Sequence, residues 1–170
     1  CGPAGSGKTN TIAWLAHRLA SLHDNDDQQI FDNVIIMTDR VVVDRQLQKA
    51  IMGLEHRSGL IQVMNDKCTS QDLKYALESN TKIIVTTIQK LDLFIRKNKQ
   101  HDIYKKHVVL IFDECHRSQF GEMHQAITKH FKNYHIFGFT GTPIFAANAS
   151  LAGNPLLRTT EQAFGEKLHT

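Results

Sequence analysis

The chain has 170 residues, of which 41% are hydrophobic, and this length suits one domain with a single core. Its 20 lysines and arginines exceed its 17 aspartates and glutamates by +3, a balance that permits nucleic-acid binding without arguing for it. Three cysteines without a CxxC pair support neither a disulfide framework nor a zinc site, and no apolar run reaches the roughly 18 residues that cross a bilayer. We therefore expect a cytoplasmic protein without a membrane partner.

The first predicted element is a helix that begins directly after Thr9. Apolar residues recur there at intervals of three and four, as in an amphipathic helix: Ile12, Leu15, Ala16, Leu19 and Leu22. Trp14 and the phenylalanines of the chain are predicted to be core residues. The polar stretch 23–29 is predicted to be an exposed loop.

Short apolar runs follow and predict strands at 34–37, 60–63, 82–87, 108–112 and 135–140. A helix containing Val43, Leu47 and Ile51 is expected after the first strand, and one containing Met123, Ile127 and Phe131 before the last. Continuous apolar runs are typical of parallel strands that helices cover on both faces. The fold class is therefore α/β, with a mostly parallel, doubly wound sheet that binds ligands beyond the carboxyl ends of its strands.

Residues 2–9, GPAGSGKT, match the phosphate-binding pattern G-x-x-x-x-G-K-[ST] in full. Glycines let backbone amides turn toward phosphate oxygens, and the following helix adds its positive amino end. Lys8 is expected to reach the β and γ phosphates of ATP, and the Thr9 hydroxyl to bind Mg²⁺. The residues predicted to bind the nucleotide are Gly5, Ser6, Gly7, Lys8 and Thr9.

A second motif, Asp113-Glu114-Cys115-His116, directly follows the apolar strand that ends at Phe112. A carboxylate pair at a strand end can reach the same metal ion and the attacking water. Asp113 is expected to bind Mg²⁺, and Glu114 to orient or deprotonate the water. Together with Lys8, these two carboxylates predict an ATP hydrolase.

The two motifs, followed by Thr140-Gly141-Thr142 after the next strand, resemble motifs I, II and III of superfamily 2 helicases and translocases. Several segments are similar to the motor subunit of type I restriction endonucleases: TDR at 38–40, DRQL at 44–47, IIVTTIQK at 83–90, FDECHRSQ at 112–119 and GFTGTP at 138–143. The resemblance covers the whole chain. Cys115 departs from it, because that family more often has alanine there.

This resemblance implies a RecA-like ATP-binding lobe over residues 1–145, with its first strand upstream of Cys1, and a C-terminal extension or linker over 146–170. It also implies that His116, Thr140, Gly141 and Thr142 couple the γ-phosphate to movement between two lobes. The residues that it places near the DNA backbone are Thr38, Asp39, Arg40, Thr86 and Thr87.

By the same resemblance, the parent protein is a DNA-dependent ATPase that translocates double-stranded DNA. Its partners would be a second RecA-like lobe and a nuclease domain in the same chain, and separate specificity and methylation subunits. Hydrolysis needs an arginine from the second lobe, so the chain alone is expected to bind ATP and to hydrolyse it poorly. Two alternatives remain open: a DNA or RNA helicase of another superfamily 2 branch, and a nucleotide-controlled clamp on nucleic acid.

Overall fold

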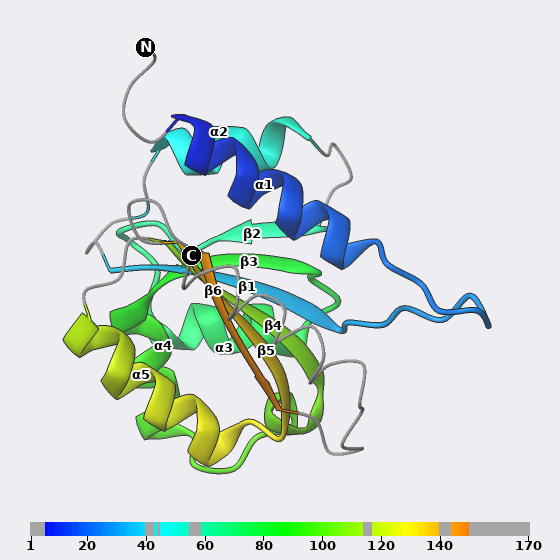
Figure 1. Cartoon of the computed structure of the whole chain (residues 1–170). Helices are drawn as coiled ribbons and strands as arrows, with labels where there is room; N and C mark the ends of the chain where they lie inside the picture. Colours follow the sequence, from blue (N-terminus) through cyan, green and yellow to red (C-terminus); the bar gives the residue numbers. More distant parts are fainter. Residues whose placement is uncertain are drawn as a thin grey trace.

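The computed structural model describes residues 6–39, 43, 45–54, 59–113, 117–139 and 144–149, without the side chains of 6, 117–119 and 144–149 (Figure 1). Its helices are α1 (Ser6–Ala20), α2 (Arg45–Gly53), α3 (Ser70–Glu78), α4 (Ile88–Lys97) and α5 (Arg117–His130), with a 3-10 helix η1 (Asp102–Lys105). Its strands are β1 (Asn33–Thr38), β2 (Ile61–Val63), β3 (Ile83–Thr87), β4 (His107–Asp113), β5 (Asn133–Phe139) and β6 (Ile144–Ala149). Each predicted strand and each predicted helix has a counterpart among these elements.

Within the described residues the strands form one sheet in the order β2-β3-β1-β4-β5-β6. The first five are parallel, and β6 runs antiparallel to β5 at the edge. The predicted mostly parallel sheet is therefore confirmed. β6 crosses the boundary expected between residues 145 and 146, so the extent of the lobe stays a prediction.

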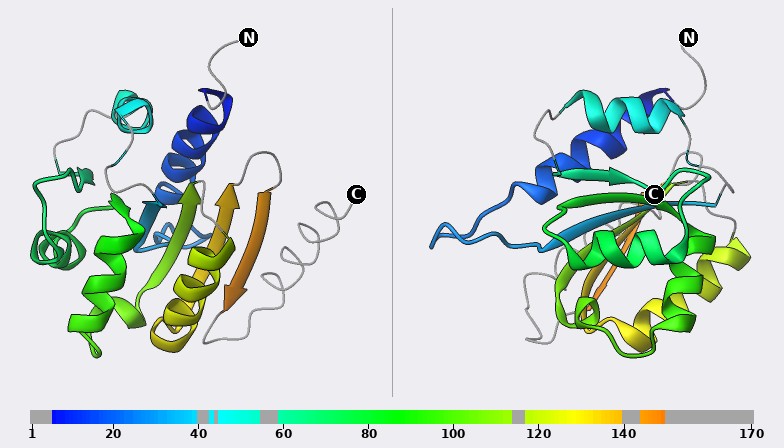
Figure 2. Two further views of the ribbon diagram at one scale, coloured as in Figure 1. Left: turned by 90° about the vertical axis from the view of Figure 1, so that its left-hand side faces the viewer. Right: turned by 180° about the vertical axis from the view of Figure 1, so that it is seen from behind.

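Side chains of β1 alternate between two hydrophobic clusters, one on each face of the sheet. Val34 and Ile36 pack with the buried residues of α1 and α2, whereas Ile35 and Met37 pack with those of α3, α4 and α5. Figures 1 and 2 show the same two helical layers on opposite faces of the sheet. The doubly wound arrangement is confirmed, and it explains why the strands are apolar throughout.

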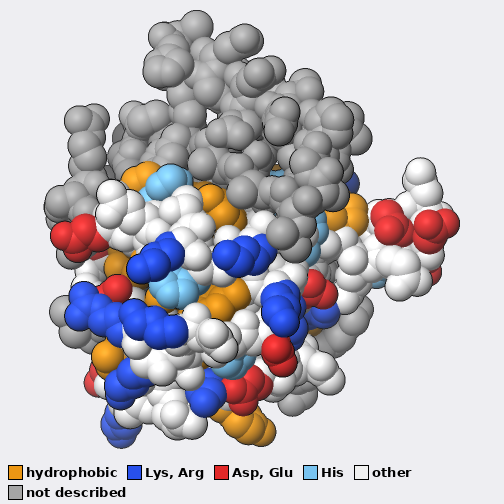
Figure 3. Space-filling model, turned by 90° about the horizontal axis from the view of Figure 1, so that it is seen from below, with side chains coloured by type: hydrophobic (Ala, Val, Ile, Leu, Met, Phe, Trp, Pro, Cys, Tyr) orange, Lys and Arg blue, Asp and Glu red, His pale blue; other side chains and the backbone are white. Residues whose placement is uncertain are grey.

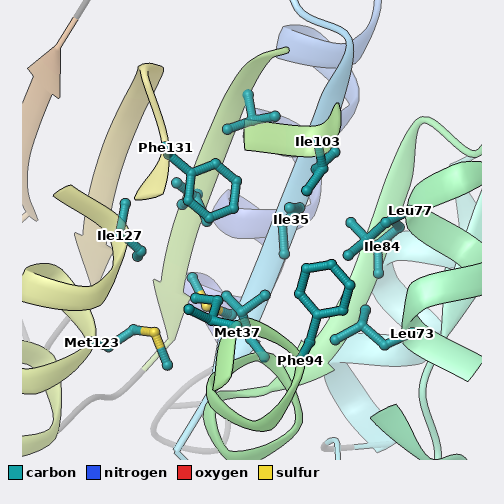
Figure 4. Close-up of a cluster of buried hydrophobic side chains, with 14 of the residues drawn as sticks. Ile35, Met37, Leu73, Leu77, Ile84, Phe94, Ile103, Met123, Ile127 and Phe131 are labelled. Atoms are coloured by element: carbon teal, nitrogen blue, oxygen red, sulfur yellow. The ribbon is translucent and has the colours of Figure 1, made fainter. Parts of the chain in front are cut away.

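The larger cluster lies under α4 and α5 (Figure 4). Phe94 from α4 and Phe131 from the residue after α5 are fully buried and fill the space beside Ile35 of β1. Phe131 lies one residue beyond the helix predicted to contain it, although its N–H still donates to the Ile127 carbonyl at 2.8 Å.

On the opposite face, α1 and α2 pack against each other and against the sheet. The ring Nε2 of His17 lies 2.7 Å from the carbonyl oxygen of Ile51, which ties the two helices together near the end of α2. The apolar face of α1 that meets the sheet consists of Ile12, Ala13, Ala16 and Ala20.

Trp14 is a correction to the predicted core, because the residue is 58% exposed. It follows Ile12 by two positions, about 200° around a helix, and so points away from the sheet. Its size and apolar character were a weaker guide than its position in the helical repeat. The prediction holds for the buried phenylalanines Phe31, Phe94, Phe112, Phe131 and Phe139.

The stretch 23–29 is an exposed loop, as predicted, and it is closed by an isolated bridge between His23 and Gln29. The Asp24 carboxylate accepts from the backbone N–H groups of Asp26 at 2.9 Å and Gln28 at 3.0 Å. The loop therefore has a defined turn although it packs on no core.

Candidate nucleotide-binding site

Three of the predicted site residues meet at the carboxyl edge of the sheet because of its parallel register. Thr38, the last residue of β1, pairs with Thr87 of β3 on one side and with Asp113 of β4 on the other. Asp113 in turn pairs with Phe139 at the end of β5. Residues far apart in the sequence are thus aligned at one edge, where ligands of doubly wound sheets bind.

Lys8 reaches this edge from the first turn of α1. Its Nζ lies 3.1 Å from Oδ1 of Asp113, and the two side chains are only 15% and 11% exposed. An ion pair this shielded is less screened by water than a surface pair. The structure therefore brings the lysine of the first motif and the first carboxylate of the second motif into direct contact, at the edge of the sheet where both motifs were expected.

The amino end of α1 is suited to an anion. Its first turn contains no acidic side chain, and its leading N–H groups have no partners within the helix. Within the described part of the chain, a Cβ added to Gly7 would meet no atom closer than 4 Å, so this glycine leaves open space rather than serving packing. Thr9 is buried one residue after Lys8, and the Thr11 hydroxyl donates to the Gly7 carbonyl at 2.7 Å.

The oxygen ligands at this edge fit a magnesium ion bound together with a nucleotide. Thr9 supplies a hydroxyl, and Asp113 supplies a carboxylate. Mg²⁺ usually takes one or two protein oxygens and completes its shell with water and phosphate oxygens. Thr9 and Asp113 are accordingly the residues that would hold it.

Four of the residues predicted to contact DNA are described. Thr38, Thr86 and Thr87 are buried, and Asp39 is half-buried. The Thr87 hydroxyl accepts from the backbone N–H of Lys90 at 3.2 Å and so caps α4. Contact with DNA stays a prediction for all four residues.

Gln89 is a residue of this edge to which the sequence analysis gives no role. Its side-chain amide donates to the Asp39 carbonyl at 3.2 Å and thereby joins the end of β1 to the first turn of α4. The only sequence signal for this contact was the position of Gln89 two residues after a strand end. This signal is weak, because a polar residue in the first turn of a helix is usually solvated.

The remaining predicted site residues lie outside the described residues: Gly5, Arg40, Glu114, His116, Thr140, Gly141 and Thr142. Only the backbone of Ser6 is described. Their predicted roles are untested by the geometry.

A match to the SWI2/SNF2 ATPase family spans residues 3–170. The chain belongs to this family. The membership agrees with a phosphate-binding loop whose lysine pairs with a strand-end aspartate, and it indicates the use of a nucleotide. No helix within the described ranges of this SWI2/SNF2 chain is long and apolar enough to cross a membrane.

Individual relatives of this SWI2/SNF2 chain are endonuclease subunits of type I restriction enzymes. One from Staphylococcus saprophyticus and one from Staphylococcus aureus are each 40% identical over 168 residues, which is 98% of this chain and 17% of each relative. A C-terminal part of a putative endonuclease subunit from Mycoplasma pneumoniae is 39% identical over 133 residues, covering 75% of this chain and 59% of that protein. The predicted resemblance to type I restriction subunits is confirmed, and this chain spans about one sixth of the Staphylococcus proteins.

Proposed function

We propose that this chain is the ATP-binding lobe of a motor that translocates double-stranded DNA in a type I restriction-modification complex. The observation that carries the proposal is the contact between Lys8 and Asp113 at the carboxyl edge of the sheet. It joins a phosphate-binding lysine to a carboxylate suited to Mg²⁺, and SWI2/SNF2 membership and the restriction-enzyme relatives support it.

The site residues would divide the work of hydrolysis among them. Lys8 would hold the β and γ phosphates, and the backbone of Gly5, Ser6 and Gly7 would surround them. Thr9 and Asp113 would hold Mg²⁺, which neutralises charge on the phosphates when bound. Glu114, adjacent to Asp113, would orient or deprotonate the attacking water.

The proposal extends to the parts of the motor that this chain does not supply. Residues 1–145 would form the lobe and 146–170 a C-terminal extension or linker toward a second RecA-like lobe, with the first residues of this extension completing β6. The second lobe would contribute the arginine for hydrolysis. His116, Thr140, Gly141 and Thr142 would couple the γ-phosphate to the movement of the two lobes. A nuclease domain and the specificity and methylation subunits complete the proposed complex, and a DNA substrate implies a cytoplasmic location.

ATPase activity of the full-length protein with its partner subunits tests the proposal. The activity is measured without nucleic acid and with duplex DNA, single-stranded DNA or RNA, for the natural protein and for Glu114→Gln. We expect stimulation by duplex DNA, and a Glu114→Gln protein that binds nucleotide normally but hydrolyses it about 100-fold or more slowly.

Stimulation by RNA alone would replace the proposal with an RNA helicase of another superfamily 2 branch. Duplex binding that depends on ATP but not on Glu114 would instead indicate a nucleotide-controlled clamp. Equal loss of nucleotide binding and hydrolysis in Glu114→Gln would assign Glu114 a structural role.

A further inference from the structure

Six lysines surround Tyr104 at the amino edge of the sheet. They come from the end of α4 and the segment after it, from η1 and the residue after it, and from the last turn of α5 and the residue before β5. We call them the Tyr104 lysine patch: Lys97, Lys99, Lys105, Lys106, Lys129 and Lys132. Figure 3 looks onto the side of the molecule that carries α4 and α5, where Lys and Arg side chains gather.

Contacts of Tyr104 hold the three segments together. Its hydroxyl donates to the carbonyl of Asn98, between two patch lysines, and its carbonyl accepts from the Lys132 N–H at 2.9 Å. Its ring packs on Phe131 at 5.0 Å and on His130 at 5.3 Å between centroids. The lysines are therefore displayed by a fixed backbone rather than by a loose loop.

The patch is basic, and most of its lysines are exposed to solvent. Five of its lysines are exposed and Lys106 is half-buried, and Asp102 is the one acidic residue in the segments 97–107 and 129–132. With six lysines and one aspartate, these segments carry a net charge of +5, whereas the whole chain carries +3. The remaining residues therefore have a net charge of −2. The net positive charge of the chain therefore comes from these segments.

Some charges beside the patch pair with each other, and the exposed Asp32 beside Lys106 accepts from the backbone N–H of His107 at 2.9 Å. Arg96 pairs with Asp92 at 3.0 Å, and Glu78 accepts from His101 at 2.9 Å. Within the described residues, no ion pair engages the six patch lysines. They remain able to bind an external polyanion.

The patch and the nucleotide site lie at opposite ends of β4. His107, next to Lys106, begins this strand, and Asp113 ends it. Six residue steps along a strand separate the two ends by about 20 Å. The patch is therefore distinct from the strand-end residues that are proposed to contact DNA.

We propose that the Tyr104 lysine patch binds the phosphate backbone of duplex DNA. Clustered lysines neutralise phosphates without reading the base sequence. Binding of single strands usually adds exposed aromatic rings on which bases stack, whereas Phe94, Tyr104 and Phe131 are all buried here. The inference rests on the proposed function and adds to it a second DNA contact that guides the duplex on the far side of the lobe.

The test uses the full-length protein with its partner subunits and a short duplex that lacks a recognition site. Lys105→Gln with Lys132→Gln removes two exposed patch charges, and Lys49→Gln with Lys67→Gln removes two exposed charges elsewhere as the matched control. Fluorescence anisotropy measures duplex affinity at rising salt concentration, and ATPase activity is measured with and without the duplex.

We expect the patch variant to bind the duplex about tenfold or more weakly at low salt, with a salt slope shallower by about 1.8 for two lost phosphate contacts. The control variant should keep the parent affinity within about twofold. ATPase activity without DNA should be the same in all three proteins, because neither pair of lysines lies at the nucleotide site.

Unchanged affinity and slope in the patch variant would overturn the inference, as would a loss of affinity confined to single-stranded DNA. Failure to assemble with partner subunits at unchanged DNA affinity would make the patch a protein interface instead. If the natural protein shows no duplex-stimulated ATPase, the proposed function itself fails. If it is stimulated and the patch variant matches it in affinity and slope, only the patch assignment fails.

Discussion

At the scale of single residues, Lys8 and Asp113 define what the site can do. Their charges satisfy each other at 3.1 Å in a partly buried setting, so the position of each depends on the other. Phosphate oxygens and the Asp113 carboxylate are alternative anionic partners for the same ammonium group. The pair therefore links nucleotide binding to the end of β4.

Replacing Lys8 with alanine should remove this charge from both the phosphates and Asp113. We expect nucleotide affinity to fall at least tenfold and ATPase activity of the full-length protein by about 100-fold or more. Titration with a fluorescent nucleotide and a turnover assay measure the two effects. Lys74→Ala on α3 is the control, and unchanged turnover in Lys8→Ala would contradict the assignment of the phosphate-binding loop.

A second residue pair, His107 and His135, lies at the amino edge of β4 and β5. Their Nε2 atoms are 3.0 Å apart, and the Phe31 ring packs against both imidazoles at 4.6 and 5.3 Å. Burial, followed by the charge of His107, lowers the pKa of His135 to about 4. Burial also lowers the pKa of His107, against the opposing effects of the Ile30 backbone and Asp32.

Protonation of this pair should make the protein less stable in acid. Because the pKa of His135 falls from 6.5 in the unfolded chain to about 4 in the folded one, its contribution is fully present above pH 6.5 and is lost as the pH falls toward 4. We expect a loss of roughly 2 kcal/mol in the free energy of unfolding at pH 5. Denaturant titration measures it, with His135→Gln expected to flatten the pH dependence and the exposed His23→Gln to leave it unchanged. An identical profile for both variants would refute the role of the pair.

At the scale of elements, apolar periodicity predicted the five parallel strands and the helices α1, α2 and α5, because helices cover both faces of the sheet. The helices α3 and α4 and the edge strand β6 were not predicted. In α3 the exposed Tyr75 interrupts the apolar pattern, and α4 follows the apolar strand β3 without a break. The structure fixes the start of α3 through Thr69, whose side chain accepts from the N–H groups of Gln71 and Asp72 while Asp72 accepts from Thr69. The pairing of β6 with β5 had no sequence signal, because pairing depends on tertiary contacts.

Adjacent residues of α4 allow a matched test of its packing. Phe94 is fully buried in the larger cluster, whereas Leu93 is 42% exposed. Phe94→Ala should reduce the free energy of unfolding by about 3–5 kcal/mol through lost burial and the cavity it leaves. Leu93→Ala should cost less than about 1 kcal/mol. Thermal or denaturant unfolding compares them, and similar losses would contradict the described orientation of α4.

At the scale of the whole molecule, the parallel register determines how much of the site could be predicted. Motifs at strand ends are brought to one edge by any doubly wound sheet, so the sequence predicted that Lys8 and Asp113 lie at the same edge. The capping role of Thr87 and the amide contact of Gln89 could not be predicted from the sequence, because each depends on how α4 starts.

One lobe should hold the nucleotide without turning it over efficiently, since the arginine that stabilises the transferring phosphoryl group is proposed to come from a second lobe. We expect the isolated chain, with its fold checked by circular dichroism, to bind ATP but to hydrolyse it about 1,000-fold more slowly than the full-length protein with DNA. Equal turnover in the two would show that the single lobe contains a complete active site.

The hydrogen bond from His17 to Ile51 couples α1 to α2 mechanically on their face of the sheet. α1 begins at the nucleotide site, and α2 begins soon after the end of β1, close to the residues proposed for DNA contact. Two helices that are packed and tied in this way are expected to shift together rather than separately. If α1 tilts when a nucleotide binds at Lys8, we expect the start of α2 to tilt with it, toward the residues proposed for DNA contact.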